Sequence, residues 1–124
     1  MNIEELRDYC LSKTGVTEGF PFGEETLVFK VGEKLFLLIG LEHGKWFNVK
    51  CDPELAIELR ERHWEITPGF HMNKKHWNSV RLDGNLSFKQ LQAQIDHSYE
   101  LVLQSLPKKL QEEIKALASN TGQT

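Results

Sequence analysis

The chain has 124 residues with a hydrophobic fraction of 40% and a charged fraction of 27%, which are ordinary values for one globular domain. They argue against a disordered chain, and no apolar run approaches the ~18 residues that a membrane-spanning helix needs. The formal net charge of −3 argues against a surface that binds nucleic acid on every side, because nucleic-acid-binding domains are usually basic overall.

The first residues of the chain predict a capped helix and then an aromatic turn. Asn2 is a good N-cap and Glu5 stands at the capping-box position, so we expect a helix that begins after Asn2 and ends at Gly15. Residues 20–23 read Phe-Pro-Phe-Gly, which predicts a rigid turn. We expect its two phenylalanine rings to close one end of the core.

Three strands follow, and we expect them over residues 27–31, 34–41 and 46–51. A two-residue turn with Gly32 at its first central position joins the first two strands and predicts a type II′ hairpin. The connections are short, so these strands form an antiparallel meander with one face on the core and one face free.

The third strand alternates between two kinds of side chain. Phe47 and Val49 point to one face, which we expect to be the core. Trp46, Asn48 and Lys50 point to the other face. A tryptophan on the side away from the core therefore marks the free face of the predicted sheet.

The second half of the chain predicts three helices and two more strands. Asp52 is a cap followed by proline, and we expect the helix that it begins to run to about Arg62. Ser87 caps the longest helix, and Pro107 begins a last amphipathic helix. The remaining strands are expected over residues 64–67 and 77–82.

The element order α-βββ-α-ββ-α-α predicts a two-layer α+β domain. Its antiparallel sheet should have about five strands, with helices covering the apolar face. We expect a single domain over residues 1–118 and a flexible, polar C-terminal tail over residues 119–124.

Positive charge gathers in one segment of the acidic chain. Residues 60–81 hold five Lys or Arg residues against two acids, together with three of the five histidines. Trp77 is three and five residues from Val80 and Leu82 in the predicted strand, so its ring points to the face opposite those two apolar side chains. The acids gather elsewhere, chiefly at Glu4, Glu5, Asp8, Glu18, Glu24 and Glu25.

Catalytic and metal-binding patterns are weak. His71 and His76 are five residues apart, which does not align two ligands on one helical face, and no carboxylate stands near them. Cys51 precedes a helix N-terminus, which lowers the pKa of a thiol, but the strand pattern points it toward the core. No glycine-rich phosphate loop occurs. We expect no enzyme, no catalytic residue, no metal and no cofactor.

The cysteines and the N-terminus predict a cytoplasmic protein. Cys10 and Cys51 are far apart and fit reduced thiols. The first residues lack the basic stretch followed by an apolar one with which a secretory signal begins. We expect no membrane partner, and a monomer or weak dimer.

Taken together, several segments resemble the MmcQ/YjbR family of small bacterial proteins. The most specific is His71-x-Asn73-Lys74-x-His76-Trp77, within residues 68–80. The others are Phe20-Pro21-Phe22-Gly23, Phe29-Lys30-Val31, Lys34-Leu35-Phe36, Lys50-Cys51-Asp52-Pro53, Leu82-Asp83-Gly84, and Ser98-Tyr99 with Leu101-Val102.

The resemblance implies a compact α+β domain that is frataxin-like or related to secretion-chaperone folds. It also implies DNA binding through a double-wing arrangement, and it brings no catalytic residues. Frataxins bind iron through an acidic first helix, which adds an iron-binding alternative here through Glu4, Glu5 and Asp8. Acids in a first helical turn also complement the helix dipole.

Functions from different classes stay open. The first is a non-enzymatic module that binds DNA or another polyanion. Its expected binding residues are Lys50, His71, Lys74, Lys75, His76, Trp77 and Arg81. The second is a protein-interaction or chaperone-like adaptor that uses the exposed sheet face around Trp46 and Asn48. The third is an unrecognised enzyme with a pocket that pairs His71 or His76 with Cys51.

Overall fold

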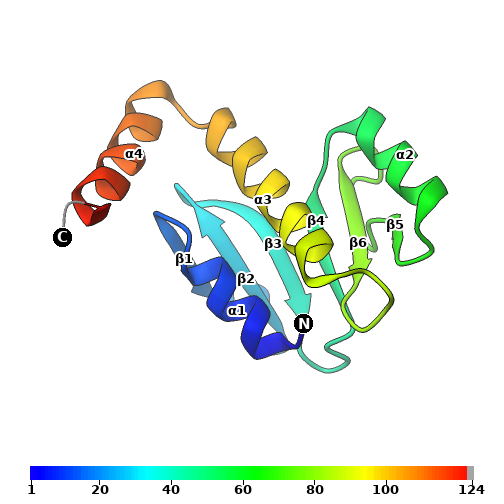
Figure 1. Cartoon of the computed structure of the whole chain (residues 1–124). Helices are drawn as coiled ribbons and strands as arrows, with labels where there is room; N and C mark the ends of the chain where they lie inside the picture. The colour runs from blue at the N-terminus through cyan, green and yellow to red at the C-terminus, as the bar shows by residue number, and fades with distance from the viewer. Residues whose placement is uncertain (123–124) are drawn as a thin grey trace.

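The computed structural model describes residues 1–122, with side chains described through residue 118. Its strands form one antiparallel sheet, and its helices lie against one face of that sheet (Figure 1). The strands are β1 (Val16–Gly19), β2 (Thr26–Val31), β3 (Lys34–Gly40), β4 (Trp46–Lys50), β5 (Ile66–Pro68) and β6 (Trp77–Arg81). The helices are α1 (Ile3–Leu11), α2 (Pro53–Arg62), α3 (Phe88–Ser105) and α4 (Lys108–Gly122). The predicted α+β fold is confirmed.

The strand order is β1-β2-β3-β4-β6-β5, and every neighbouring pair is antiparallel. The first four strands follow one another in chain order. The chain then leaves the sheet through α2, adds β5 at the far edge, and returns as β6 between β4 and β5. β4 and β6 are therefore adjacent strands, although α2 and β5 separate them in the sequence.

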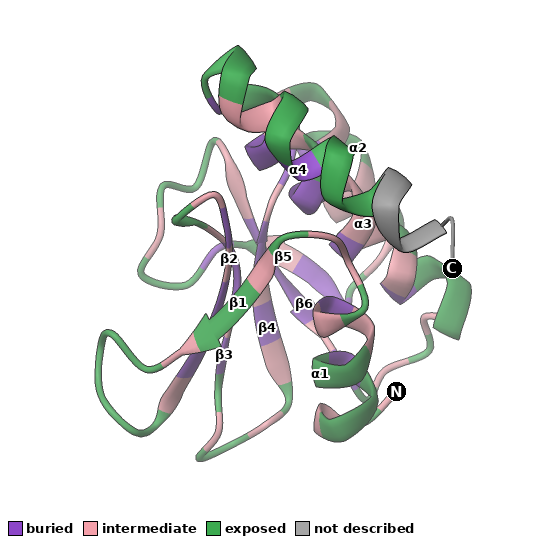
Figure 2. Cartoon of the chain, turned by 90° about the vertical axis from the view of Figure 1, so that its left-hand side faces the viewer, coloured by how far each residue is buried: buried purple, intermediate pink, exposed green. Residues whose placement is uncertain are grey.

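One face of the sheet forms the core together with the helices (Figure 2). Phe47 and Val49 of β4 are fully buried there, and Val80 of β6 lies opposite Phe47. Burying one large apolar side chain stabilises the fold by roughly 1.5–3 kcal/mol, so this face decides where the helices lie. α3 supplies buried residues once per turn, singly or as neighbouring pairs, at Leu91, Ile95, Ser98, Tyr99, Val102 and Leu103.

The opposite face of the sheet, called the free face below, is covered by none of the described helices (Figure 2). Two loops border it instead, residues 20–25 between β1 and β2, and residues 69–76 between β5 and β6. Since loops cover less area than helices, most side chains on this face keep some contact with solvent, although Val28 and Ser79 are buried.

The helix starts agree with the sequence. Asn2 accepts the N–H of Glu5 at 2.8 Å while Glu5 accepts the N–H of Asn2 at 3.1 Å, which completes the predicted capping box of α1. Asp52 accepts two backbone N–H groups at the start of α2. Ser87 and Gln90 form a second capping box at the start of α3. α1 ends at Leu11, earlier than predicted.

The edge strand β1 was not predicted, so the sheet has six strands instead of about five. Its four residues show no apolar alternation that would mark a strand. Backbone pairing with β2 defines it, from Val16 opposite Val31 to Gly19 opposite Val28. The ion pair between Arg7 and Glu18 also joins α1 to β1, but an exposed pair adds only ~0–1 kcal/mol. Pairing with β2 is therefore the main reason that residues 16–19 form a strand.

The prediction that the rings of residues 20–23 close the core is wrong. Phe20 is 49% exposed and Phe22 is 69% exposed. The turn leaves β1 on the side of the free face, where Phe20 lies near Val28 and Lys30. The rings therefore border the free face and leave the core to the helices.

The turn between β2 and β3 is also different from the prediction. Gly32 and Glu33 both have positive φ values, 55° and 67° respectively. This is the pattern of a type I′ turn rather than a type II′ turn. A Cβ atom on Gly32 would lie 2.5 Å from a methyl carbon of Leu106. Both the backbone conformation and the close approach of the α3 end require glycine at this position.

In the described part of the chain, no helix combines the length and the apolar character that crossing a membrane requires. α4 continues to Gly122, into the segment predicted as a tail. Side chains from residue 119 onward, and residues 123–124 altogether, lie outside the described residues, so the flexibility of residues 119–124 stays a prediction.

Replacing Gly32 tests the packing of the β2–β3 turn. Gly32→Ala should lower the free energy of unfolding by about 1–3 kcal/mol, because it adds a methyl group against Leu106 at a positive φ. Gly40→Ala is the matched control, because a Cβ there meets nothing within 4 Å. Urea unfolding curves measure both, and equal midpoints for the two variants would contradict the packing described.

Candidate binding surface on the free face of the sheet

The pairing of β4 with β6 arranges the free face in a regular pattern. The opposed pairs there are Trp46 with Arg81, Asn48 with Ser79, and Lys50 with Trp77. Because side chains of a strand alternate, these residues share the face opposite Phe47 and Val49. Each end of the ladder therefore carries one cation and one indole, with a polar pair between them.

At one end, Trp46 is held between two side chains. The guanidinium carbon of Arg81 lies 5.3 Å from the centre of the indole. The ring of Phe70 contacts the same indole edge to face, with centroids 5.4 Å apart. Arg81 also donates to the carboxylate of Asp83, and this hydrogen bond lowers the pKa of Asp83. The guanidinium group of Arg81 is thus engaged by both Asp83 and Trp46.

In the middle of the ladder, three polar groups form a chain of hydrogen bonds. The backbone N–H of Phe70 donates to Ser79 Oγ at 2.9 Å, and Ser79 Oγ donates to Asn48 Oδ1. Ser79 Oγ thus accepts from Phe70 and gives its hydroxyl proton to the amide oxygen of Asn48. The Asn48 NH₂ group is thereby left for other partners, and it has none among the described residues.

The loop of residues 69–76 is fixed to the sheet from several sides. The N–H of Gly69 donates to Trp77 O at 2.8 Å, and Lys74 Nζ donates to Gly69 O at 3.1 Å. From α2, Arg60 donates to Asn78 Oδ1 at 2.8 Å and to the carbonyl oxygens of Lys74 and Trp77. These bonds close the loop on itself, so its side chains project from a defined backbone.

The far end of β4 is fixed as well. The N–H of Lys50 donates to Ser98 Oγ of α3 at 2.8 Å, and the N–H of Cys51 donates to His76 O at 2.7 Å. The second bond brings the end of the 69–76 loop directly beside Lys50. Lys50, Trp77 and the lysines of the loop therefore lie at the same end of the ladder, which is called the basic end below.

A hollow of about 650 Å³ opens on the free face between the two bordering loops. Its floor comes from the sheet, with Leu38, Trp46 and Asn48, and Phe22 lies on one side. The 69–76 loop and the β3–β4 turn supply further lining residues, Phe70, His71, Met72 and His43. The volume lies within the roughly 300–1,000 Å³ of most small-molecule sites, and the lining is mainly apolar and aromatic, as such sites usually are.

The structure brings together only part of the predicted site. Lys50, Lys74, Lys75, His76 and Trp77 lie at the basic end, where Lys75 is exposed and Lys50, His76 and Trp77 are half-buried. Two other predicted residues lie apart from them. His71 has a left-handed φ of 60° and lines the hollow, and Arg81 is at the opposite end of β6.

Sequence reasoning singled out Trp46, Asn48 and His71, which line the hollow, but missed other residues that build it and hold its border. Arg60 was counted only as a charge, yet it fixes the loop from beneath. Phe22 was assigned to the core, and Phe70 was not singled out. The exposed fractions of Phe22 and Phe70, 69% and 45%, follow from loop positions that no periodic pattern marks.

The cysteines are buried and chemically quiet. Burial raises the pKa of the Cys51 thiol to about 11, and the neighbouring Asp52 adds to the rise. Burial also raises the pKa of Cys10 to about 12. Both thiols thus stay protonated near neutral pH. Among the described residues, no three His, Cys, Asp or Glu side chains come together in a way that could hold a metal ion.

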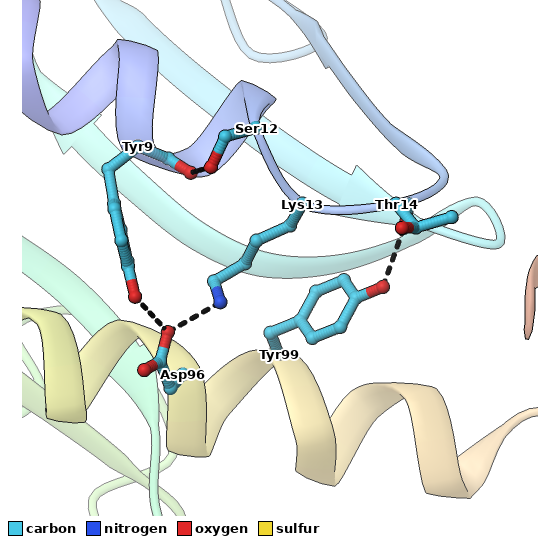
Figure 3. Close-up of polar contacts among 6 residues, drawn as sticks. All are labelled: Tyr9, Ser12, Lys13, Thr14, Asp96 and Tyr99. Atoms are coloured by element: carbon cyan, nitrogen blue, oxygen red, sulfur yellow. Dashed lines mark hydrogen bonds and ion pairs between the residues drawn. The ribbon is translucent and has the colours of Figure 1, made fainter. Parts of the chain in front are cut away.

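A second polar cluster joins α1 to α3 on the helical side of the molecule (Figure 3). Tyr9 Oη donates to Asp96 at 2.6 Å, and Lys13 forms an ion pair with the same carboxylate oxygen. The Lys13 amine lies 4.9 Å and 5.1 Å from the ring centres of Tyr9 and Tyr99, and Tyr99 Oη donates to Thr14 O at 2.6 Å. Its polar groups thus already have partners within the cluster.

The chemistry of this cluster is structural. Burial and the hydrogen bond to Asp96 raise the pKa of Tyr9 to about 12, so the phenol remains a donor at neutral pH. A cavity of about 450 Å³ lies beside it, partly bounded by α4. Because Asp96 neutralises Lys13 and the phenols are engaged, the cluster fastens the N-terminal helix to α3.

A sequence model of the YjbR family matches residues 11–101, most of the chain and both strands of the ladder. The chain belongs to the YjbR family. The uncharacterised protein YjbR of Escherichia coli K12 is 35% identical over 109 residues, covering 87% of this chain and 92% of that protein. YbdF of Escherichia coli O157:H7 is 39% identical over 97 residues, covering 77% of this chain and 80% of that protein.

Two solved structures superpose on most of this chain. The crystal structure of Deinococcus radiodurans protein DR2400 superposes with a TM-score of 0.86 at 36% identity, covering 92% of this chain and 88% of that one. A Pseudomonas syringae crystal structure superposes with a TM-score of 0.70 at 30% identity, covering 82% of this chain and 99% of that one. The fold described here is therefore also found in solved structures of related sequence.

The burial of Cys51 in this YjbR-family chain has a direct chemical consequence. With a pKa of about 11, roughly one Cys51 thiol in a thousand is ionised at pH 8, and the thiolate is the reactive form. The native protein should therefore leave a disulfide reagent such as DTNB almost unreacted at pH 8. In guanidinium chloride both cysteines should react, and rapid labelling of one thiol in the native protein would contradict this account.

Proposed function

We propose that this protein is a non-enzymatic, cytoplasmic binding module that holds DNA or another polyanion at the basic end of the free face. The observation that carries the proposal is the pairing of Lys50 with Trp77 on the free face, directly beside the Lys74–Lys75 loop. Lysine side chains bind phosphates through charge, and an indole beside them offers a flat surface for a base or sugar.

The surroundings of the basic end favour an anionic partner. Asp52, the acid nearest to Lys50 in sequence, uses its carboxylate to accept two N–H groups at the start of α2. Other acids lie on α1, on the helical side of the sheet, and further ones lie on α2 and on the 20–25 loop: Glu4, Glu5 and Asp8, then Glu54, Glu58 and Glu61, then Glu24 and Glu25. The net charge of −3 is therefore distributed unevenly, and the basic end can attract phosphates although the whole chain is acidic.

The small number of lysines at the basic end sets the expected strength. About three phosphate contacts, through Lys50, Lys74 and Lys75, correspond to a salt slope of roughly −3 in a plot of log K against log salt concentration. Such binding is weak and depends little on sequence, because phosphate contacts carry no base information.

Charge removal at the 69–76 loop tests the proposal. Lys74→Ala/Lys75→Ala should weaken binding to a fluorescent duplex and reduce the salt slope by about 2, as measured by anisotropy over about 50–200 mM salt. Lys108→Ala/Lys109→Ala is the matched control, because it removes the same charge from exposed positions at the start of α4. Equal loss in both variants, or absence of wild-type binding to the duplex and to a single strand alike, would contradict the proposal.

Protein binding is a second candidate function, favoured by one observation. The exposed rings of Phe22 and Phe70 border an apolar hollow, which suits an aromatic or aliphatic side chain of a partner and an adaptor role. Peptides selected from a random library at high salt should then share an apolar anchor and lose binding to Phe70→Ala. Peptides without a recurring anchor would remove this candidate.

A further inference from the structure

We infer that the hollow on the free face takes an unstacked nucleobase, so that the polyanion held at the basic end is a single-stranded nucleic acid. This inference rests on the proposed function and deepens it by naming the class of partner. A base in a duplex is stacked and paired, and its flat faces cannot reach a hollow of this kind. A base of a single strand can enter, while its neighbouring phosphates lie toward Lys50.

The rings that border the hollow have the exposure that stacking needs. Phe22 is 69% exposed on one loop and Phe70 is 45% exposed on the other, so each offers ring surface to a ligand. Trp46 lies between them on the floor and is kept in place by Phe70 and Arg81. Aromatic side chains on an open sheet are a usual platform for unpaired bases, because every base has an apolar flat face.

The floor of the hollow also offers hydrogen-bond donors. The bond from Ser79 engages the oxygen of Asn48 and leaves its NH₂ group, with two donors, unpartnered among the described residues. All nucleobases carry ring nitrogen or carbonyl acceptors on their edges, and a base that enters between the two rings can accept from this group. An aliphatic partner side chain would leave these donors without a partner.

The residues that line the hollow suit a nucleotide, although Glu24 and Glu25 belong to the loop that borders it. None of the described residues that line it carries a carboxylate, and its titratable members are His43 and His71. Asn48 and Lys50 are two residues apart on one strand, about 6.7 Å along it, on the same face. A base above Asn48 therefore brings its backbone within reach of the Lys50 amine, which joins the hollow to the basic end.

The decisive experiment compares two oligonucleotides with equal phosphate number. One is oligothymidylate, and the other has the same backbone with abasic sites in place of the thymines. Phosphate contacts are the same for both, so the inference predicts that the thymine strand binds the wild-type protein about tenfold more tightly or better. Fluorescence anisotropy at one fixed salt concentration gives both dissociation constants.

Variants locate the effect. Phe22→Ala should reduce the preference for the thymine strand toward equality while leaving affinity for the abasic strand unchanged. Phe88→Ala is the control, since it removes an exposed ring at the start of α3 outside the hollow, and its exposed fraction of 44% matches that of Phe70, 45%. Thermal unfolding of both variants verifies that each is folded, and Phe70→Ala repeats the test from the opposite loop.

The outcomes separate the two claims. Equal affinity of the wild type for both strands would overturn the base-binding inference and leave the polyanion proposal standing. A thymine preference that survives in both Phe22→Ala and Phe70→Ala would also overturn it, because the base would then lie elsewhere. Absence of binding to either strand would overturn the inference together with the proposed function.

Discussion

The antiparallel pairing of β4 with β6 is the constraint on which the surface of this protein depends. Five consecutive pairs run from Trp46 opposite Arg81 to Lys50 opposite Trp77 without a shift. A shift by one residue would exchange the two faces, placing Trp77 and Arg81 in the core and Val80 in solvent. Burial of Phe47 against Val80 therefore fixes the free face as firmly as it fixes the core.

Polar bonds then convert this register into a shaped surface. Ser79 joins the sheet to the 69–76 loop through Phe70 and to β4 through Asn48. Arg60 anchors the same loop from α2. Because Ser79 is fully buried, each of its bonds that is lost would cost roughly 1–3 kcal/mol. The hollow and the basic end are thus held in place by the same loop of residues 69–76, and they are not independent patches.

The sequence predicted those parts of the fold that depend on periodicity and capping. Asn2, Asp52 and Ser87 begin helices as expected, and the alternation around Phe47 identifies the two faces of β4. β1 escaped prediction because only its pairing with β2 makes it a strand. Phe22 was misplaced because a loop ring carries no pattern that tells a core from a surface.

The candidate site was predicted in part, for a similar reason. Local sequence placed Lys74, Lys75 and Trp77 near one another, and the register added Lys50 as expected. The local sequence could not reveal that Asp83 and Trp46 engage Arg81, since those contacts depend on the turn after β6 and on β4. A count of charges along the chain therefore included Arg81 in the basic surface, and it gave no sign of the aromatic surface that Phe22 and Phe70 form at the hollow.

The central claim is that this protein binds its partner through the free face of the sheet and not through the helical side. The most direct measurement is a ¹H–¹⁵N NMR titration of the protein with oligothymidylate. The account predicts shift changes concentrated at Asn48, Phe70 and Lys75, with α1 and α4 unaffected. Changes concentrated around Tyr9 and Lys13, or no changes at all, would contradict it.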